Sequence, residues 1–121
     1  MPITQCLHTA ILVTDLAKAE EFYSNILGLP KAEKRSLKFS GGWYQIGEYQ
    51  IHLIVNSDFS NQIFNPDKWG RNPHISLGTD NLAEIIAKLQ SRGYPVQMSS
   101  SGRAALFTKD PDGNILEISQ I

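Results

Sequence analysis

The stretch "LHTAILVTDLAKAEEFYSNILGL", residues 7–29, decides the fold, because a strand pattern changes there into a helical one. Its first part, "LHTAILV", is rich in apolar and β-branched residues, which predicts a strand over 7–13. The apolar residues that follow recur at helical spacing, so we expect a helix over 14–29 with Asp15 as its N-cap. Gly28 is the residue type expected just past the end of such a helix.

The same order returns in "PHISLGTDNLAEIIAKLQSRG", residues 73–93. A strand is predicted over 73–79 and a helix over 80–93. Asn81 and Glu84 stand at the spacing of a capping box, which marks the helix start. A strand–helix pair that occurs twice in one chain indicates an internal repeat.

Three further strands are expected after each helix, which completes a βαβββ pattern in both halves. They are 31–40, 42–47 and 50–56 in the first half, and 95–101, 104–110 and 114–120 in the second. "DPDGN" is a strong turn signal before the last strand. The pattern predicts an α+β fold in a single domain, 1–121, with modules of about 1–56 and 72–121 and a linker over 57–71. A connection of this length is often functional.

Composition excludes several classes of protein. The chain has 121 residues, a net charge of −1, 41% apolar residues and 19% charged residues, as in an ordinary globular domain. No basic surplus points to nucleic acid or to an anionic membrane. No apolar run approaches the ~20 residues that span a bilayer, and no signal peptide is evident. The single cysteine, Cys6, excludes an internal disulfide and fits a cytoplasmic location.

The chain's three histidines and one glutamate fall at equivalent places in the two halves. His8 and His52 lie 44 positions apart, in the first and last predicted strands of the first half. His74 and Glu117 lie 43 positions apart, in the first and last predicted strands of the second half. Since side chains alternate along a strand, their apolar neighbours face the other side. We therefore expect one face of each sheet to pack on helices while the other presents imidazole or carboxylate.

Four such polar groups in an apolar surrounding would be costly without a partner, and a divalent metal would supply one. Three imidazoles and a carboxylate suit Zn²⁺, Ni²⁺, Co²⁺ or Fe²⁺ better than Ca²⁺ or Mg²⁺. The alternative is that the four are unrelated core or surface residues. The sequence holds no His-x-x-His cluster, so the metal hypothesis depends on the predicted fold.

Residues 7–29 and 73–93, together with "DPDGNILEI" (110–118), closely resemble the vicinal oxygen chelate superfamily. That group includes glyoxalase I, extradiol dioxygenases and bleomycin resistance proteins. The resemblance covers nearly the whole chain, and it implies paired βαβββ modules that form a cupped mixed sheet around a metal. It also implies a homodimer, because superfamily members of this size usually pair modules between chains.

The resemblance to glyoxalase I implies a ligand set and a mechanism. In that enzyme the first and last strand of each module supply the metal ligands, and these positions here are His8, His52, His74 and Glu117. Many bacterial glyoxalases carry glutamate where this chain has His52. The implied cofactor is one divalent ion (Zn, Ni, Co, Mn or Fe) that holds two neighbouring substrate oxygens and stabilises an enediolate. Glu117 is then the catalytic base.

The resemblance also implies substrate-binding residues for a small oxygenated molecule such as a glutathione adduct. Arg35 and Arg103 are the candidates for binding glutathione carboxylates, although most arginines are solvated surface residues. Trp43, Tyr44 and Phe107 are candidates for lining the cup, with core packing as the alternative.

Two other functions fit the same residues. His8, His74 and Glu117 alone would make the two-histidine, one-carboxylate triad of an Fe²⁺ extradiol-type dioxygenase, although His52 would then occupy a position needed for oxygen. A non-catalytic protein that binds a drug or metabolite is the third hypothesis. Antibiotic-binding members of the superfamily generally lack the metal ligands, whereas this chain retains all four.

Overall fold

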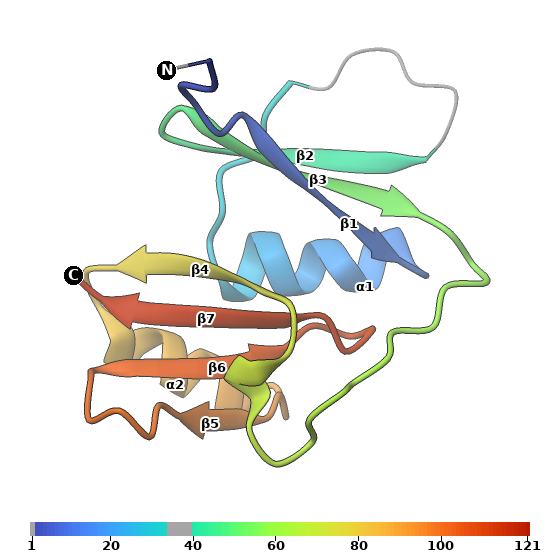
Figure 1. Cartoon of the computed structure of the whole chain (residues 1–121). Helices are drawn as coiled ribbons and strands as arrows, with labels where there is room; N and C mark the ends of the chain where they lie inside the picture. Colours follow the sequence, from blue (N-terminus) through green and yellow to red (C-terminus); the bar gives the residue numbers. More distant parts are fainter. Residues whose placement is uncertain (1, 34–39) are drawn as a thin grey trace. The chain divides into compact units, whose positions relative to one another are not determined.

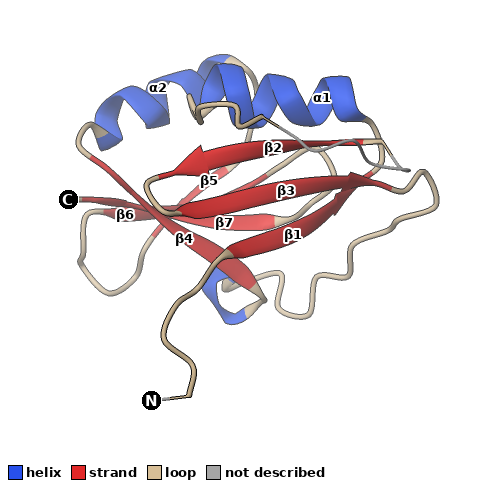
Figure 2. Ribbon diagram, turned by 90° about the horizontal axis from the view of Figure 1, so that it is seen from above, coloured by secondary structure: helices blue, strands red, loops and turns tan. Residues whose placement is uncertain are grey.

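The structure is a computed structural model that describes residues 2–33 and 40–121 and divides into two compact units, Met1–Phe59 and Ser60–Ile121 (Figure 1). The division falls inside the predicted linker. Each unit combines a mixed β-sheet with helical segments, so the predicted α+β class is confirmed (Figure 2). No helix in the described ranges has the length and apolar character that a membrane crossing requires.

The first unit places its strands in the order β1-β3-β2, with β1 parallel to β3 and β2 antiparallel to it. Its elements are β1 (His8–Val13), α1 (Leu16–Glu20), the π-helical segment η1 (Glu21–Ile26), β2 (Gly41–Ile46) and β3 (Tyr49–Val55). The strand predicted over 31–40 has no counterpart in its described part, where Lys31 forms only an isolated bridge with Tyr44. Residues 34–39 lie outside the described part of the chain.

The first helix differs from the prediction in its second half. The Asp15 side chain accepts from the backbone N–H of Lys18 at 3.0 Å, which confirms the predicted N-cap. The turns then widen over η1, and the Leu27 N–H donates to the Phe22 carbonyl, five residues earlier. Phe22, Tyr23 and Ile26 are buried, so the wider turns still present an apolar face to the sheet.

The second unit has the strand order β4-β7-β6-β5, with β4 parallel to β7 and the other pairs antiparallel. Its elements are the 3₁₀ turn η2 (Trp69–Arg71), β4 (His74–Thr79), α2 (Leu82–Ser91), β5 (Val96–Met98), β6 (Ala105–Lys109) and β7 (Ile115–Gln120). Asn81 accepts from the Glu84 N–H at 3.1 Å, which confirms the predicted helix start. The predicted βαβββ order is therefore present in this unit.

Each sheet buries one face against its helical segment. In the first unit this face carries apolar side chains from all three strands: Ile11, Val13, Tyr44, Ile51 and Leu53. In the second unit Leu106, Leu116 and Ile118 are buried, as are Leu82 and Leu89 of α2. Each fully buried large aliphatic side chain contributes about 1.5–3 kcal/mol by leaving water. Along each strand the intervening residues point to the opposite face, and there the candidate metal ligands lie.

The adjacent glycines of β2 give a matched test of how closely β2 approaches β3. A Cβ at Gly41 would overlap the Leu53 carbonyl oxygen, whereas a Cβ at Gly42 would meet Leu16 Cδ1 at an ordinary 3.8 Å. We expect Gly41→Ala to lower the free energy of unfolding by about 1–3 kcal/mol, because backbone must move to relieve the overlap. Gly42→Ala, the control, should change it far less. Urea denaturation of both variants measures the difference, and equal stabilities would contradict the close approach of β2 to β3 at Gly41.

Candidate functional site

Three rings stack on the open face of the first sheet. Trp43 lies directly opposite His52 in the pairing of β2 with β3, and their ring centroids are 3.9 Å apart with an interplanar angle of 3°. His8 of β1 stacks against His52 with centroids 4.1 Å apart and an angle of 12°. His52 therefore shares a ring contact with both neighbouring strands. The predicted proximity of His8 and His52 is present within this unit.

Hydrogen bonds assign the ring nitrogens of His52. Its Nε2 lies 2.8 Å from Gln50 Oε1, and the Gln50 amide nitrogen donates to Gln45 Oε1 at 2.6 Å. Because the Gln50 nitrogen is used as a donor, its oxygen accepts from His52 Nε2–H. In the neutral ring, the lone pair of His52 is then on Nδ1.

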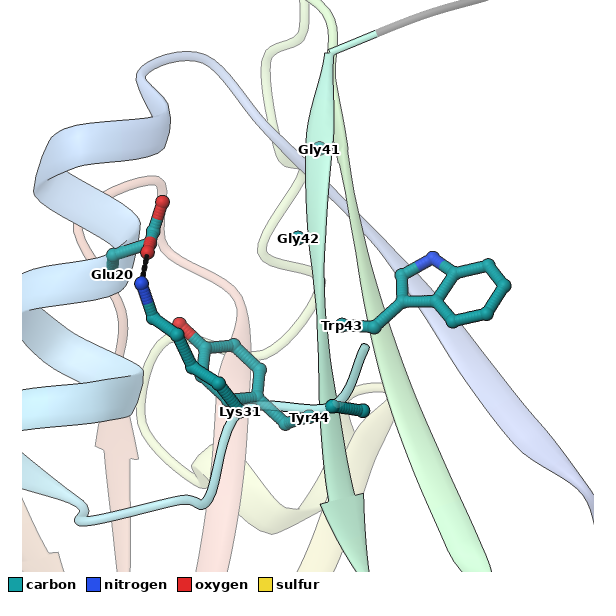
Figure 3. A pocket seen from close by; sticks show the side chains of 7 residues that line it. Glu20, Lys31, Gly41, Gly42, Trp43 and Tyr44 are labelled. Atoms are coloured by element: carbon teal, nitrogen blue, oxygen red, sulfur yellow. Dashed lines mark hydrogen bonds and ion pairs between the residues drawn. The ribbon is translucent and has the colours of Figure 1, made fainter. Parts of the chain in front are cut away.

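Trp43 and Tyr44 point to opposite sides of β2, as Figure 3 shows. Tyr44 is only 1% exposed and packs on the helical side, 6.1 Å from the Tyr23 ring centroid. Burial, together with the nearby Glu20 carboxylate, raises the pKa of Tyr44 to about 12. Neighbours in a strand face opposite sides, so Tyr44 takes the alternative of core packing. Only Trp43 shares the face of the histidines.

His74 and Glu117 lie side by side on the open face of the second sheet. Ser76, two residues after His74, pairs with Glu117 between β4 and β7, so both side chains share one face. His74 Nε2 lies 3.6 Å from Glu117 Oε1, and Glu117 is 8% exposed. Phe107 is opposite Glu117 on β6, and its ring meets His74 edge-on at 5.5 Å. The tight turn at Asp110, whose side chain accepts from the Asn114 N–H at 2.8 Å, joins β6 to β7.

The second carboxylate oxygen of Glu117 has its own partner. Arg103 Nη2 lies 2.7 Å from Glu117 Oε2, and Arg103 Nε donates to Ser101 Oγ at 3.1 Å. A mostly buried carboxylate needs such a partner, since an unpaired buried charge is strongly destabilising. The predicted substrate-binding residue Arg103 is thus engaged with Glu117. The other predicted arginine, Arg35, lies outside the described residues.

A cavity of about 350 Å³ borders Phe107 in the second unit. Its wall includes Lys68 and Arg71 from the linker and Ser99 to Ser101 from the connection between β5 and β6. At Gly70, a Cβ would come within 2.5 Å of the Phe107 ring, so glycine lets the linker approach this ring. The sequence did not single out the cationic side chains of Lys68 and Arg71, because the order of residues in the linker does not indicate which side chains face a cavity.

The two units repeat one arrangement on different residues. His8 and His74 lie in the first strand of each unit, His52 and Glu117 in the strand parallel to it, and Trp43 and Phe107 in the antiparallel strand that follows across the sheet. Each unit thus brings two potential metal ligands together beside an aromatic ring. Over residues 2–33 and 40–121 there is no group of three or more His, Cys, Asp or Glu side chains that could hold a metal ion. Imidazole nitrogens and a carboxylate are nevertheless ligands that first-row divalent metals accept.

The fold and these paired residues define a protein of two α+β units with a pair of potential metal ligands on each sheet. The second unit has the βαβββ order, and the first shows βαββ in its described residues. The sequence model of the Glyoxalase/Bleomycin resistance protein/Dioxygenase superfamily matches residues 5–118, so the chain belongs to this superfamily. Lactoylglutathione lyase from Salmonella typhimurium is 27% identical over 120 residues, which cover 93% of this chain and 89% of that protein. The chain spans only 43% of the length of lactoylglutathione lyase GLX1 from Arabidopsis thaliana, with which it is 24% identical.

Solved structures show the same fold. A glyoxalase family protein from Bacillus anthracis matches with a TM-score of 0.76 and 21% identity, over 96% of this chain and 93% of that one. TnmS3, an antibiotic binding protein from Streptomyces sp. CB03234, matches with a TM-score of 0.69 and 22% identity, over 99% and 98% of the two chains. The fold is thus common to a glyoxalase family protein and to a binding protein.

Proposed function

We propose that the chain is a metal-dependent lyase or isomerase of glyoxalase type, with His8, His52, His74 and Glu117 as the metal ligands. The main support is the equivalent placement of His8 with His74 and of His52 with Glu117 in the two sheets. The ligand types fit, since they comprise three imidazoles and a carboxylate. The proposal requires the two pairs to meet around one ion. When bound, a divalent ion would act as a Lewis acid that stabilises an enediolate.

Within this proposal Glu117 is the base that removes the α-proton of the substrate. Its Oε1 faces His74 at 3.6 Å, while its Oε2 is held by Arg103. Arg103 neutralises the carboxylate when no cation is bound, so a charged base can remain in a mostly buried position. Phe107 and Trp43 stand opposite Glu117 and His52 in the sheets, where their rings would exclude water from the reacting atoms.

The substrate is proposed to be a small adduct of glutathione with a 2-oxoaldehyde. This follows the names of the lactoylglutathione lyases that resemble the chain. Because Arg103 pairs with Glu117, we assign the glutathione carboxylates to Lys68 and Arg71 in the cavity beside Phe107. The dimeric state and the cytoplasmic location stay predictions.

Binding without catalysis is the second candidate function. It is favoured by the flat stack of Trp43, His52 and His8, whose outer faces suit a planar ligand, and by the likeness to TnmS3. Formation of S-lactoylglutathione from methylglyoxal and glutathione tests the enzyme proposal. A metal-loaded protein without this activity, which still binds small aromatic molecules, would favour the binding role. Oxygen consumption with catechols would instead support the dioxygenase hypothesis.

Metal binding is testable without any substrate. Protein purified without chelator should contain about one divalent ion per site, and His74→Ala should lose most of it, because the variant lacks one of the four proposed ligands. Ser76→Ala is the matched control, since Ser76 lies two residues further along the same face of β4. Elemental analysis of the three proteins measures the difference. Equal metal content in His74→Ala and the control would exclude His74 as a ligand.

A further inference from the structure

Asn72 is a buried polar residue that no part of the proposed reaction uses. It is only 5% exposed, and its side chain forms five hydrogen bonds. Its Oδ1 accepts from the backbone N–H groups of Phe64 and Asn65 at 2.7 and 2.9 Å. Its two amide N–H groups donate to the carbonyls of Asn65 and Trp69 at 2.8 and 3.1 Å, and the Lys68 carbonyl, 3.4 Å from the same nitrogen, shares one of these hydrogens. One side chain thus links both ends of the segment 64–72.

This segment is also attached to the sheet beside it. Gln97 of β5 accepts from the Trp69 N–H at 3.0 Å and donates to the Asp67 carbonyl at 2.9 Å. The ammonium of Lys109 on β6 lies 4.3 Å from the centre of the Trp69 ring. The segment 64–72 is therefore held from within by Asn72 and from outside by β5 and β6. Its backbone position is specified by these contacts.

The fixed backbone ends at a ring nitrogen of His74. The Asn72 carbonyl lies 2.7 Å from His74 Nδ1, and a carbonyl can only accept, so Nδ1 carries the proton. The lone pair of the neutral ring is then on Nε2, the nitrogen that lies 3.6 Å from Glu117. Partners of this kind fix the tautomer and the orientation of metal-binding histidines.

We propose that Asn72 is a positioning residue that fixes the tautomer and ring orientation of His74, so that Nε2 is presented beside Glu117. It acts through its backbone carbonyl, which its own buried side chain holds in place. The inference about the tautomer concerns the protein alone. Its consequence for metal affinity rests on the proposed function.

The tautomer is measurable in the full-length, metal-free protein. A long-range ¹H–¹⁵N spectrum of the histidine rings, recorded well above the ordinary histidine pKa of about 6.5, distinguishes Nδ1–H from Nε2–H. We expect His74 to be in the Nδ1–H form, assigned by the loss of its signals in His74→Ala. A wild-type protein whose His74 is in the Nε2–H form would overturn the proposal without any further variant.

Two variants of Asn72 and one control distinguish the positioning of His74 from a general loss of protein stability. Asn72→Ala removes all five side-chain bonds, and Asn72→Asp removes the donors while keeping an acceptor. Both should convert His74 to a mixture of tautomers, and metal affinity measured by chelator competition should fall by about 10–100-fold. Asn81→Ala, the control, loses the N-cap of α2 in the same unit and should keep the Nδ1–H form.

The outcomes distinguish this proposal from the proposed function. A folded Asn72→Ala protein with unchanged His74 signals overturns the positioning role. If Asn72→Ala does not fold, Asn72→Asp replaces it, because it removes the amide donors while keeping an acceptor, and unchanged His74 signals in it would also overturn the role. Altered tautomers in a protein that binds no divalent metal would support the positioning role and contradict the proposed function.

Discussion

Replacing Glu117 with glutamine is expected to lower turnover by about 10²–10⁴-fold, the usual contribution of a general base. Glutamine preserves the shape of the side chain and can still accept from Arg103, so the sheet around it should not change. It cannot accept the substrate proton, and it removes one negative charge from the proposed metal ligands. The measurement is the rate of S-lactoylglutathione formation at saturating metal, with metal content determined in the same samples.

Glu84→Gln provides the matched control for this variant. Glu84 is an exposed residue of α2 that lies 3.4 Å from Lys88, so its charge can be removed without touching the site. Turnover of this control should stay within about twofold of wild type, since exposed ion pairs contribute little. If Glu117→Gln retained both its metal and nearly full turnover, another group would have to be the base.

Periodicity in the sequence was sufficient to predict which strands the candidate ligands occupy. His8, His52, His74 and Glu117 all lie in strands, and each pair shares one face of its sheet. The prediction of strands and faces succeeds because alternation along a strand is a local property. Helix caps are equally local, since a single residue such as Asp15 forms the cap. Whether the four bind one metal ion is a different question, and it stays a prediction.

Other features depend on contacts that no local pattern encodes. Arg103 and Glu117 are 14 positions apart in the chain, and only the β6–β7 pairing brings them together. The widening of the first helix at Phe22 preserves an apolar face, so periodicity alone describes it as an ordinary helix. Asn72 follows a polar linker in which several asparagines look alike, and only its burial identifies it. For Tyr44 the sequence left cup lining and core packing open, and its burial on the helical side of β2 decides for core packing.

The role of His52 can be separated into two parts, because its ring has two kinds of contact. Its Nε2 is hydrogen-bonded to Gln50, and its faces stack on His8 and Trp43. Stacked aromatic pairs contribute about 0.5–1.5 kcal/mol each beyond their burial. A residue that is only a stacking element and a residue that is also a ligand therefore respond differently to substitution.

His52→Phe is expected to keep the stack but to lower metal affinity by more than about 100-fold, because loss of a direct ligand should exceed the 10–100-fold cost of losing an outer partner.

His52→Glu should keep the metal but lose the ring stack. It restores the carboxylate that many glyoxalases carry at this position, so it should keep metal and turnover, while the free energy of unfolding falls by about 1–2 kcal/mol through loss of the stack. Chelator competition and urea denaturation on the same two proteins measure both quantities. Wild-type metal affinity in His52→Phe would mean that His52 only stabilises the sheet by stacking. The ligands of any bound metal would then be His8, His74 and Glu117 alone. Those three leave positions open for oxygen, and the dioxygenase hypothesis would then take precedence.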